Sequence, residues 1–377
     1  MLTRRDAIAM TIAGFSVPWS QAGAETTTAF TDMQYAKAMV IDGLGGLGGF
    51  DPNLPDDAPL PAKWVADAHT SGVTAINLTV NAVGNAPGAF DNTILYIASI
   101  EHELTAHPDV FLKVLNPGHL AEAKASNRMG LIFGCQDTSM LEGDLKRLAV
   151  FYDLGVRICQ PTYNRQNLMG DGCLEPADGG LSRLGHEFVA EMNRLHMLLD
   201  LSHAGPRTIA DGIAASKVPM AITHTGCRAL VDVPRNTYDK ELKALADRGG
   251  VVGIYFMPFL KASGQQHAQD LIRHLEHAVN ICGEDHVGLG TDGTISAIEL
   301  NAAYAEFQRK FFESRTKAGI AAPGEAADVF NLIPELNDPR RFRSLADALS
   351  RQGWPSNRIE KILGANFARL FADVWSA

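Results

Sequence analysis

The fold is decided by two stretches, Leu198-Leu199-Asp200-Leu201-Ser202-His203 and Met220-Ala221-Ile222-Thr223-His224. Each is a short apolar run that stops at a histidine. In parallel α/β sheets, metal ligands and catalytic groups lie at the carboxyl ends of the strands. We therefore predict that these runs are two successive strands, and that His203 and His224 lie together at the same end of the sheet.

Further apolar runs of similar length alternate with helical patterns along most of the chain. The helical patterns include residues 184–195 and 268–282, where apolar side chains recur every three to four positions. Eight strands that alternate with helices predict an α/β fold with a parallel sheet closed into a (β/α)8 TIM-type barrel. The predicted strands are residues 39–42, 73–80, 130–135, 156–160, 197–201, 219–223, 251–256 and 287–291, with residues 110–115 as a candidate for an additional strand.

Two segments extend the predicted barrel. The connection over residues 294–332 is long and mostly helical, which is typical of a lid or of a packing extension over the barrel mouth. Residues 344–375 have the pattern of two C-terminal helices, over 345–351 and 359–375. The sequence therefore predicts a single barrel domain, residues 25–377, with extra helices in these two places.

The first 24 residues have the pattern of an export signal. Thr3-Arg4-Arg5 precedes an apolar stretch over residues 7–18, and Ala22-Gly23-Ala24 fits a cleavage site. The adjacent arginines indicate the twin-arginine route, so we expect an exported, periplasmic protein. The apolar stretch is shorter than the ~20 residues that span a bilayer, and we expect no membrane-spanning segment.

Composition narrows the range of partners. The 377-residue chain carries a net charge of −10, which argues against nucleic acid and against anionic membrane surfaces as partners. Its five cysteines include no Cys-x-x-Cys pair, which excludes zinc ribbons and redox dithiols.

Other predicted strand ends supply the remaining candidates for a catalytic site. The first predicted strand ends at Asp42, the third is followed by Gln136, and the eighth leads to Asp292. A metallohydrolase needs an ion that activates water and a carboxylate that accepts its proton. His203 and His224 could share one ion, and Asp292 is the candidate for the carboxylate.

Several ordered motifs resemble the membrane (renal) dipeptidase family of zinc metallopeptidases, barrel enzymes related to the amidohydrolases. The resemblance runs from about residue 40 to residue 375. The motifs that carry it are Ile41-Asp42-Gly43, Gly155-Val156-Arg157, Thr162-Tyr163-Asn164, Glu191-Met192-Asn193-Arg194-Leu195, Asp200-Leu201-Ser202-His203, Thr223-His224-Thr225, Pro234-Arg235-Asn236, residues 288–292 and Leu363-Gly364-Ala365-Asn366-Phe367.

The resemblance implies roles for individual residues. His203 and His224 correspond to the histidine ligands of the family's second zinc, and Asp292 to its active-site aspartate. Arg235 corresponds to the arginine that holds the substrate carboxylate, for which its planar fork is suited. Tyr163 and Asn164 fall on a motif that contacts the substrate, and the Tyr163 hydroxyl could donate a hydrogen bond to a developing oxyanion.

The chain departs from the family at the first zinc. Leu44-Gly45-Gly46 stands where the family has a His-x-Asp pair, and Gln136 stands at the bridging glutamate. Tyr163 replaces a histidine that touches the substrate. An amide is a weaker metal ligand than a carboxylate, so Gln136 is at best a weak ligand, and we expect at most one zinc ion.

Three functions are compatible with these residues. The first is a periplasmic metallohydrolase that cleaves dipeptides or related small amides with at most one metal. The second is a catalytically inactive pseudoenzyme that serves as a binding or maturation protein. The third is a non-hydrolytic enzyme, such as an isomerase, with Tyr163 and Asp292 as acid and base. A homodimer is implied only by the resemblance.

Overall fold

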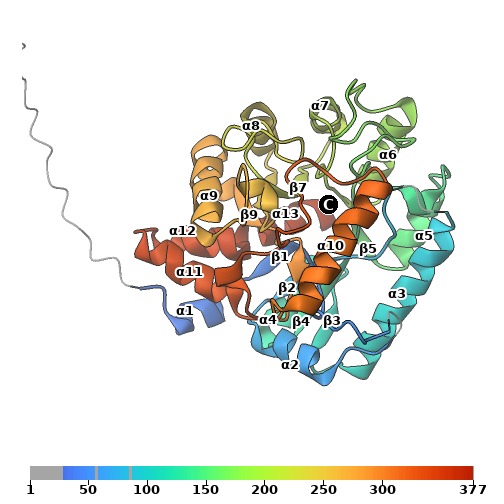
Figure 1. Ribbon diagram of the computed structural model, residues 1–377. Helices are drawn as coiled ribbons and strands as arrows, with labels where there is room; N and C mark the ends of the chain where they lie inside the picture. Colours follow the sequence, from blue (N-terminus) through green and yellow to red (C-terminus); the bar gives the residue numbers. More distant parts are fainter. Residues whose placement is uncertain (1–28, 56–57, 85–86, 377) are drawn as a thin grey trace, which may run out of the picture.

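The computed structural model describes residues 29–55, 58–84 and 87–376, in which parallel strands alternate with helices (Figure 1). The predicted export signal, residues 1–24, lies outside the described residues. The strands of the barrel are β1 (Ile41–Gly46), β2 (Ala75–Thr79), β4 (Met129–Cys135), β5 (Val156–Cys159), β6 (Leu198–Leu199), β7 (Ala221–Thr225), β8 (Val251–Ile254) and β9 (Val287–Leu289). The helices between them are α2 (Ala62–Thr70), α3 (Ala89–Ala106), α4 (Pro117–Ser126), α5 (Arg147–Asp153), α6 (Arg183–Arg194), α7 (Pro206–Ala215), α8 (Asp239–Asp247) and α9 (Ala268–Cys282).

Hydrogen bonds close these strands into a barrel. One ladder runs in the order β10-β1-β2-β4-β5-β6 and a second in the order β7-β8-β9, and all pairs are parallel. A parallel bridge between Asp200 and Ala221 joins β6 to β7. The short strand β10 (Gly293–Thr294) continues from β9 and pairs with β1, which completes the circle. The predicted (β/α)8 barrel is confirmed, and the candidate extra strand is β3 (Phe111–Lys113), which pairs with β4 outside the circle.

Asp42 helps to close the barrel. The first strand was expected to end at this residue, but β1 continues to Gly46. The buried Asp42 carboxylate accepts hydrogen bonds from the backbone N–H and the hydroxyl of Thr291, at 2.7 and 2.6 Å. These hydrogen bonds hold β1 against the segment after β9, and burial raises the pKa of Asp42 to about 7.

Strand alternation separates an inner from an outer core. One apolar residue from each of β1, β2 and β4 to β8 meets four side chains of α13 (Asn366–Trp375) in a single cluster. The α13 residues, Phe367, Leu370, Phe371 and Val374, recur at helical spacing and are fully buried. Burial of each contributes about 1.5–3 kcal/mol, so α13 is a large part of the inner core. The inner set on the strands is Ile41, Ala75, Ile132, Ile158, Leu198, Ala221 and Val251.

The alternate strand residues face outward. On β4, Leu131, Phe133 and Cys135 belong to the larger cluster between the strands and the surrounding helices. Gln136, which follows Cys135, therefore faces the inside of the barrel. All five cysteines are free thiols, and Cys135 lies opposite Cys159 in the register of β4 and β5.

The C-terminal helices differ from the prediction at one point. Helix α11 (Arg341–Arg351) covers the first expected helix, but the second is divided into α12 (Ser356–Glu360), a π-turn (Lys361–Ala365) and α13. The break occurs at Gly364, where a Cβ atom would lie 2.5 Å from the backbone nitrogen of Ile41. The chain bends there because only glycine allows this close approach to β1.

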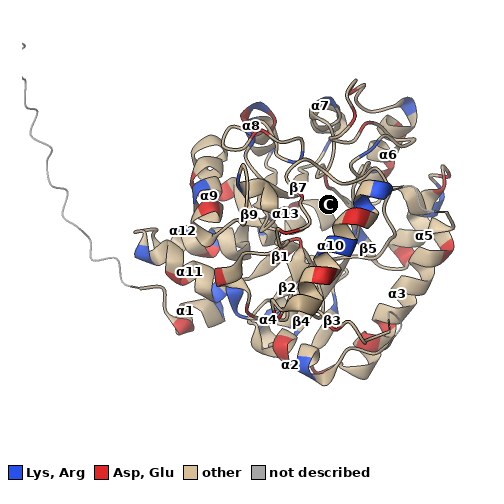
Figure 2. Ribbon diagram, viewed as in Figure 1, with Lys and Arg blue, Asp and Glu red and all other residues tan. Residues whose placement is uncertain are grey.

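Residues 318–332 form turns and loops, so the 294–332 connection is less helical than predicted. Its helix is α10 (Ala302–Lys317). It runs across the front of the barrel in Figure 1. Charged residues of both signs are distributed along this helix, whereas α3 carries Asp and Glu without Lys or Arg (Figure 2). None of the described helices is both long and apolar enough to cross a membrane.

Candidate active site

The carboxyl ends of the strands bring the predicted site residues into one region. His203 follows β6, His224 lies within β7, and Asp292 lies between β9 and β10. Tyr163 and Asn164 occupy the loop after β5. His203, His224, Tyr163 and Asn164 are all less than 9% exposed, so they form a site inside the barrel mouth and not on the surface.

His224 is fixed in one tautomer by its neighbours. The hydroxyl of Thr223 donates its only proton to the Asp200 carboxylate at 2.6 Å, so it must accept a hydrogen bond from Nδ1 of His224 at 2.9 Å. Nδ1 therefore carries the proton, and Nε2 has a free lone pair. This Nε2 is buried and has no hydrogen-bond partner among the described residues.

His203 is held in the same way. Its Nδ1 lies 2.6 Å from the side-chain oxygen of Asn164, whose amide nitrogen donates to the carbonyl of Ile320 at 2.8 Å. The amide oxygen can only accept, so Nδ1 of His203 is the protonated nitrogen. Its Nε2 is also buried without a partner among the described residues.

The two imidazoles are neighbours and uncharged. Their ring centroids are 4.9 Å apart at an interplanar angle of 61°, and Tyr163 stacks on His203 at 4.1 Å. Burial, with a smaller contribution from Arg235, lowers the pKa of both histidines well below the usual 6.5. Two neutral rings with free Nε2 lone pairs are suited to bind a divalent ion.

Arg235 brings a buried guanidinium group to this region. It lies in the segment between β7 and α8, is 4% exposed, and has one terminal nitrogen, Nη2, without a hydrogen-bond partner among the described residues. Tyr255 and Phe259 pack near the guanidinium, with ring centroids 5.6 and 5.8 Å away. A buried guanidinium with an unsatisfied N–H is costly, so a carboxylate ligand at this position would be bound favourably.

Tyr163 is positioned by a residue that the sequence interpretation did not include. Arg315 of α10 forms an ion pair with Glu325 at 2.7 Å and donates a hydrogen bond to the Tyr163 hydroxyl oxygen at 3.1 Å. Because the oxygen accepts from Arg315, the phenol proton is left to donate to a ligand. Burial raises the pKa of Tyr163, which keeps that proton in place at neutral pH.

Asp292 lies between these groups. Its backbone is in the left-handed region, with φ of 54°, and His203 has φ of 63°. Such strain in non-glycine residues is concentrated at functional sites. None of the described residues donates a hydrogen bond to the Asp292 carboxylate. Enclosure raises its pKa to about 6, against the opposing charges of Arg235 and Arg315.

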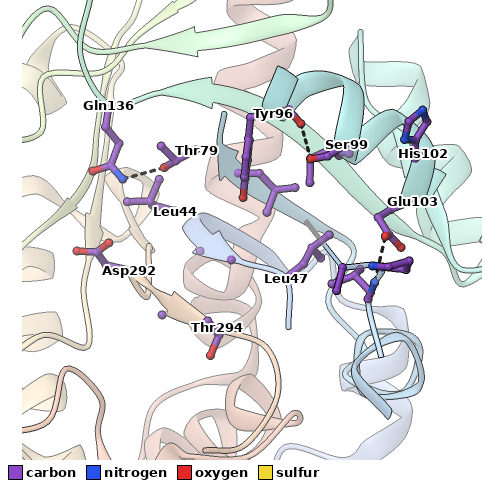
Figure 3. A pocket seen from close by; sticks show the side chains of 18 residues that line it. Leu44, Leu47, Thr79, Tyr96, Ser99, His102, Glu103, Gln136, Asp292 and Thr294 are labelled. Atoms are coloured by element: carbon purple, nitrogen blue, oxygen red, sulfur yellow. Dashed lines mark hydrogen bonds between the residues drawn. The ribbon is translucent and has the colours of Figure 1, made fainter. Parts of the chain in front are cut away.

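Asp292 lines three cavities. One of them, of about 250 Å³, lies against Phe50, Tyr304 and Phe307, and the other two meet at the site. The smaller, of about 110 Å³, is lined by His203, Tyr163, Arg235 and Arg315 among others, and we call it the arginine chamber. The larger, of about 520 Å³, extends from Asp292 and Gln136 along β1 and β2 to α3, and we call it the side pocket (Figure 3). Because Asp292 lines both cavities, a ligand that fills both passes this carboxylate.

Gln136 lines the side pocket. Its amide nitrogen donates to the Thr79 hydroxyl at 2.7 Å (Figure 3). Arg315 and Glu325 are the site residues that the sequence reasoning missed. They lie in a connection whose sequence pattern shows only helix and loop, and no local motif marks them. Asn164 was expected to bind substrate, and the structure gives it the additional role of orienting His203.

Comparison with known proteins agrees with this geometry. The chain matches the profile of the membrane dipeptidase family (peptidase family M19) over residues 65–302. It is similar to the crystal structure of an amidohydrolase from Pseudomonas aeruginosa, with 32% identity and a TM-score of 0.78 over 92% of this chain and 99% of that one. A metallo peptidase from Rhodobacter sphaeroides, crystallised with a phosphinate mimic of the dipeptide L-Ala-D-Ala, has the same fold, with 20% identity and a TM-score of 0.70 over 90% of this chain and all of that one.

Curated sequences give the same assignment. An uncharacterised protein in the pqqA 5′ region of Klebsiella pneumoniae is 28% identical over 289 residues, which are 74% of this chain and 94% of the relative. The matches to four curated dipeptidases span only 43% to 57% of those proteins. The profile match covers more than half of the chain, and the histidine pair lies within it. The chain therefore belongs to the membrane dipeptidase family, peptidase family M19.

Proposed function

We propose that this protein hydrolyses dipeptides or related small amides with at most one divalent ion, zinc by family resemblance, bound by His203 and His224. The observation that carries the proposal is the pair of buried imidazoles whose Nε2 atoms have no partner among the described residues. Burying two bare acceptors is costly unless a ligand satisfies them. A single ion between them would do so.

The residues present fit one ion and not two. Leu44 and Gly46 have no donor atoms, and the Gln136 amide is neutral, with its nitrogen already bonded to Thr79. Within the part of the chain that the structure describes, no group of three or more His, Cys, Asp or Glu side chains is arranged to hold a metal. We infer that two histidines are the protein ligands, and that water and substrate complete the coordination.

The chain's own residues then have defined tasks. A bound ion would polarise the scissile carbonyl and acidify a water molecule. Arg235 binds the carboxylate at the C-terminal end of the substrate. Asp292, ionised at neutral pH, accepts the proton from water and passes it to the leaving nitrogen. Tyr163 donates its phenol proton as a hydrogen bond to the carbonyl oxygen as negative charge develops there.

A second candidate is binding without hydrolysis. It is favoured by the uncharged side chains of Leu44 and Gln136 in the side pocket, where the family resemblance places ligands of the first zinc. We further propose that the protein acts in the periplasm, on the basis of the N-terminal sequence pattern alone.

Metal content and turnover test the proposal together. The protein, purified without chelator, is dialysed against zinc or manganese, analysed for metal, and assayed with L-Ala-L-Ala and L-Ala-D-Ala. One equivalent of metal with metal-dependent cleavage supports the hydrolase. One equivalent without cleavage of either dipeptide or of an N-acyl amino acid, or no metal under any condition, contradicts it and favours the binding protein.

Asn164→Leu should weaken metal binding without removing a ligand. The substitution leaves Nδ1 of His203 without its acceptor, so the ring loses its fixed tautomer and orientation. Loss of such a partner typically costs about 10–100-fold in metal affinity. Competition with a fluorescent zinc chelator measures the change. Asn193→Leu, in a part-buried asparagine of α6, is the matched control and should leave zinc affinity unchanged.

A further inference from the structure

The side pocket has a composition that a dipeptide would not need. The apolar part of its wall is formed by Leu44 and Leu47 of β1 and the following turn, Leu78 of β2, Ile100 of α3 and Leu60. Ser99, His102 and Glu103 of α3 add polar groups to the wall. Leu44, Leu78 and Ile100 are buried in the fold and present apolar surface to the cavity. At about 520 Å³ the pocket is within the range of small-molecule binding sites and holds far more than an alanine side chain.

Charge at the inner end of the pocket is limited to Asp292. The neighbouring polar side chains, Gln136 and Thr79, are neutral and are hydrogen-bonded to each other. The other carboxylate of the lining, Glu103, lies at the outer end, where it accepts a hydrogen bond from the Leu60 backbone at 3.0 Å. The second oxygen of Glu103, Oε2, is buried without a hydrogen-bond partner among the described residues. A substrate ammonium group would therefore find a carboxylate at either end of the pocket, but between the two ends it would lose water among apolar side chains, which is costly.

We propose that the side pocket binds an uncharged apolar acyl group, so that the preferred ligand is an N-acyl amino acid and not a dipeptide with a free N-terminal ammonium. The ligand's carboxylate lies at Arg235, its amide at Asp292, and its acyl chain in the side pocket. The hydrolysis of such a ligand rests on the proposed function above, whereas its binding does not. Water would add its hydroxyl to the acyl carbon as the C–N bond breaks, and a proton would go to the leaving nitrogen.

The glycine at position 46 allows the pocket to be filled by mutation. A Cβ atom on Gly46 would meet only the Thr294 methyl at 3.6 Å and the Gly293 carbonyl at 3.9 Å, which are ordinary contacts. The adjacent Gly45 offers no such route, because its Cβ would lie 2.6 Å from the Asp42 carboxylate. Gly46→Leu therefore adds a side chain at the lining of the pocket, and its Cβ atom makes no close contact.

Calorimetric titration of the wild-type protein tests the proposal. The ligands are N-acetyl-, N-butanoyl-, N-hexanoyl- and N-octanoyl-L-alanine. Each methylene buried in an apolar site contributes about 0.8 kcal/mol, so affinity should rise about fourfold per methylene until the pocket is full. A matched pair of ligands tests the effect of the ammonium group. N-(4-methylpentanoyl)-L-alanine is L-Leu-L-Ala without its amino group. This acyl compound should bind at least about tenfold more tightly than L-Leu-L-Ala. Affinity independent of chain length, or tighter binding of the dipeptide, overturns the proposal.

Two variants test whether the acyl chain binds in the side pocket. Gly46→Leu should weaken N-octanoyl-L-alanine by about a hundredfold or more and leave N-acetyl-L-alanine unchanged, which serves as the internal control for folding. Leu60→Asp, at a partly exposed position of the same pocket, should also weaken only the long ligand. An equal loss for both ligands in both variants contradicts the assignment of the acyl chain to this pocket.

The outcomes separate this inference from the proposed hydrolase. Binding that depends on chain length, without cleavage of any N-acyl amino acid or dipeptide, supports the pocket and contradicts hydrolysis. Cleavage of L-Leu-L-Ala, together with no effect of acyl length on binding, supports the hydrolase and contradicts the pocket.

Discussion

His224→Ala should remove the bound divalent ion and lower the rate of dipeptide hydrolysis by about a thousandfold or more. Nε2 of His224 is one of two free imidazole lone pairs in the site, and its tautomer is fixed by Thr223 and Asp200. With one histidine left, the protein has too few ligands to retain zinc. The protein then loses the several kcal/mol by which the ion, as a Lewis acid, stabilises the transition state. Each 1.36 kcal/mol added to the activation free energy lowers the rate tenfold.

His274→Ala is the matched control for this prediction. His274 is also buried, but both ring nitrogens are engaged: Nδ1 accepts from the Cys227 backbone at 2.9 Å, and Nε2 pairs with the Leu260 carbonyl at 3.1 Å. Its loss should lower thermal stability while the metal content per folded chain stays the same. Elemental analysis and steady-state rates on both variants check the pair. Unchanged turnover in the His224→Ala protein would rule out the metal mechanism.

The sequence predicted the barrel well because strand burial has a local signature. Each predicted strand is a run of four to eight mostly apolar residues, and each overlaps a strand of the barrel. The ends of the strands were less predictable from the sequence. β1 continues past Asp42 because Gly45 pairs with Leu78 of β2, and Gly45 and Gly46 pair with β10. The partner strand β10 lies about 250 residues further along the chain. The break at Gly364 depends on contact with β1 and has no local signal.

The candidate site likewise contains residues that the sequence could predict and residues that it could not. His203, His224 and Asp292 follow strand-like runs, so their position at one end of the barrel could be predicted from the sequence and the fold. Arg315 could not, because its ion pair with Glu325 and its bond to Tyr163 depend on how α10 crosses the barrel. The side pocket was also beyond the sequence, which shows Leu44 and Gly46 as replacements but not the cavity that they line.

Asp292→Asn should lower kcat/KM for a dipeptide by about 10²–10⁴-fold, the usual contribution of a general base. The amide cannot accept the proton from water, although its size matches that of the carboxylate. In the wild-type protein the base must be ionised, and enclosure raises the pKa of Asp292 to about 6. The wild-type rate should therefore fall about tenfold per pH unit below pH 6, and the variant should lose this acid limb.

The stability of the Asp292→Asn variant distinguishes a catalytic role of Asp292 from a structural one. A carboxyl group whose pKa is raised by folding binds its proton more tightly in the folded state, so its contribution to stability falls as pH rises from about 4 through 6. Above that range the charged form destabilises the fold, and Asp292→Asn should be at least as stable as the wild type at pH 8. Asp109→Asn, at an exposed position, is the control and should change neither rate nor stability. A large loss of thermal stability in Asp292→Asn at pH 8, or a rate within about twofold of the wild type, would contradict the role of Asp292 as the base.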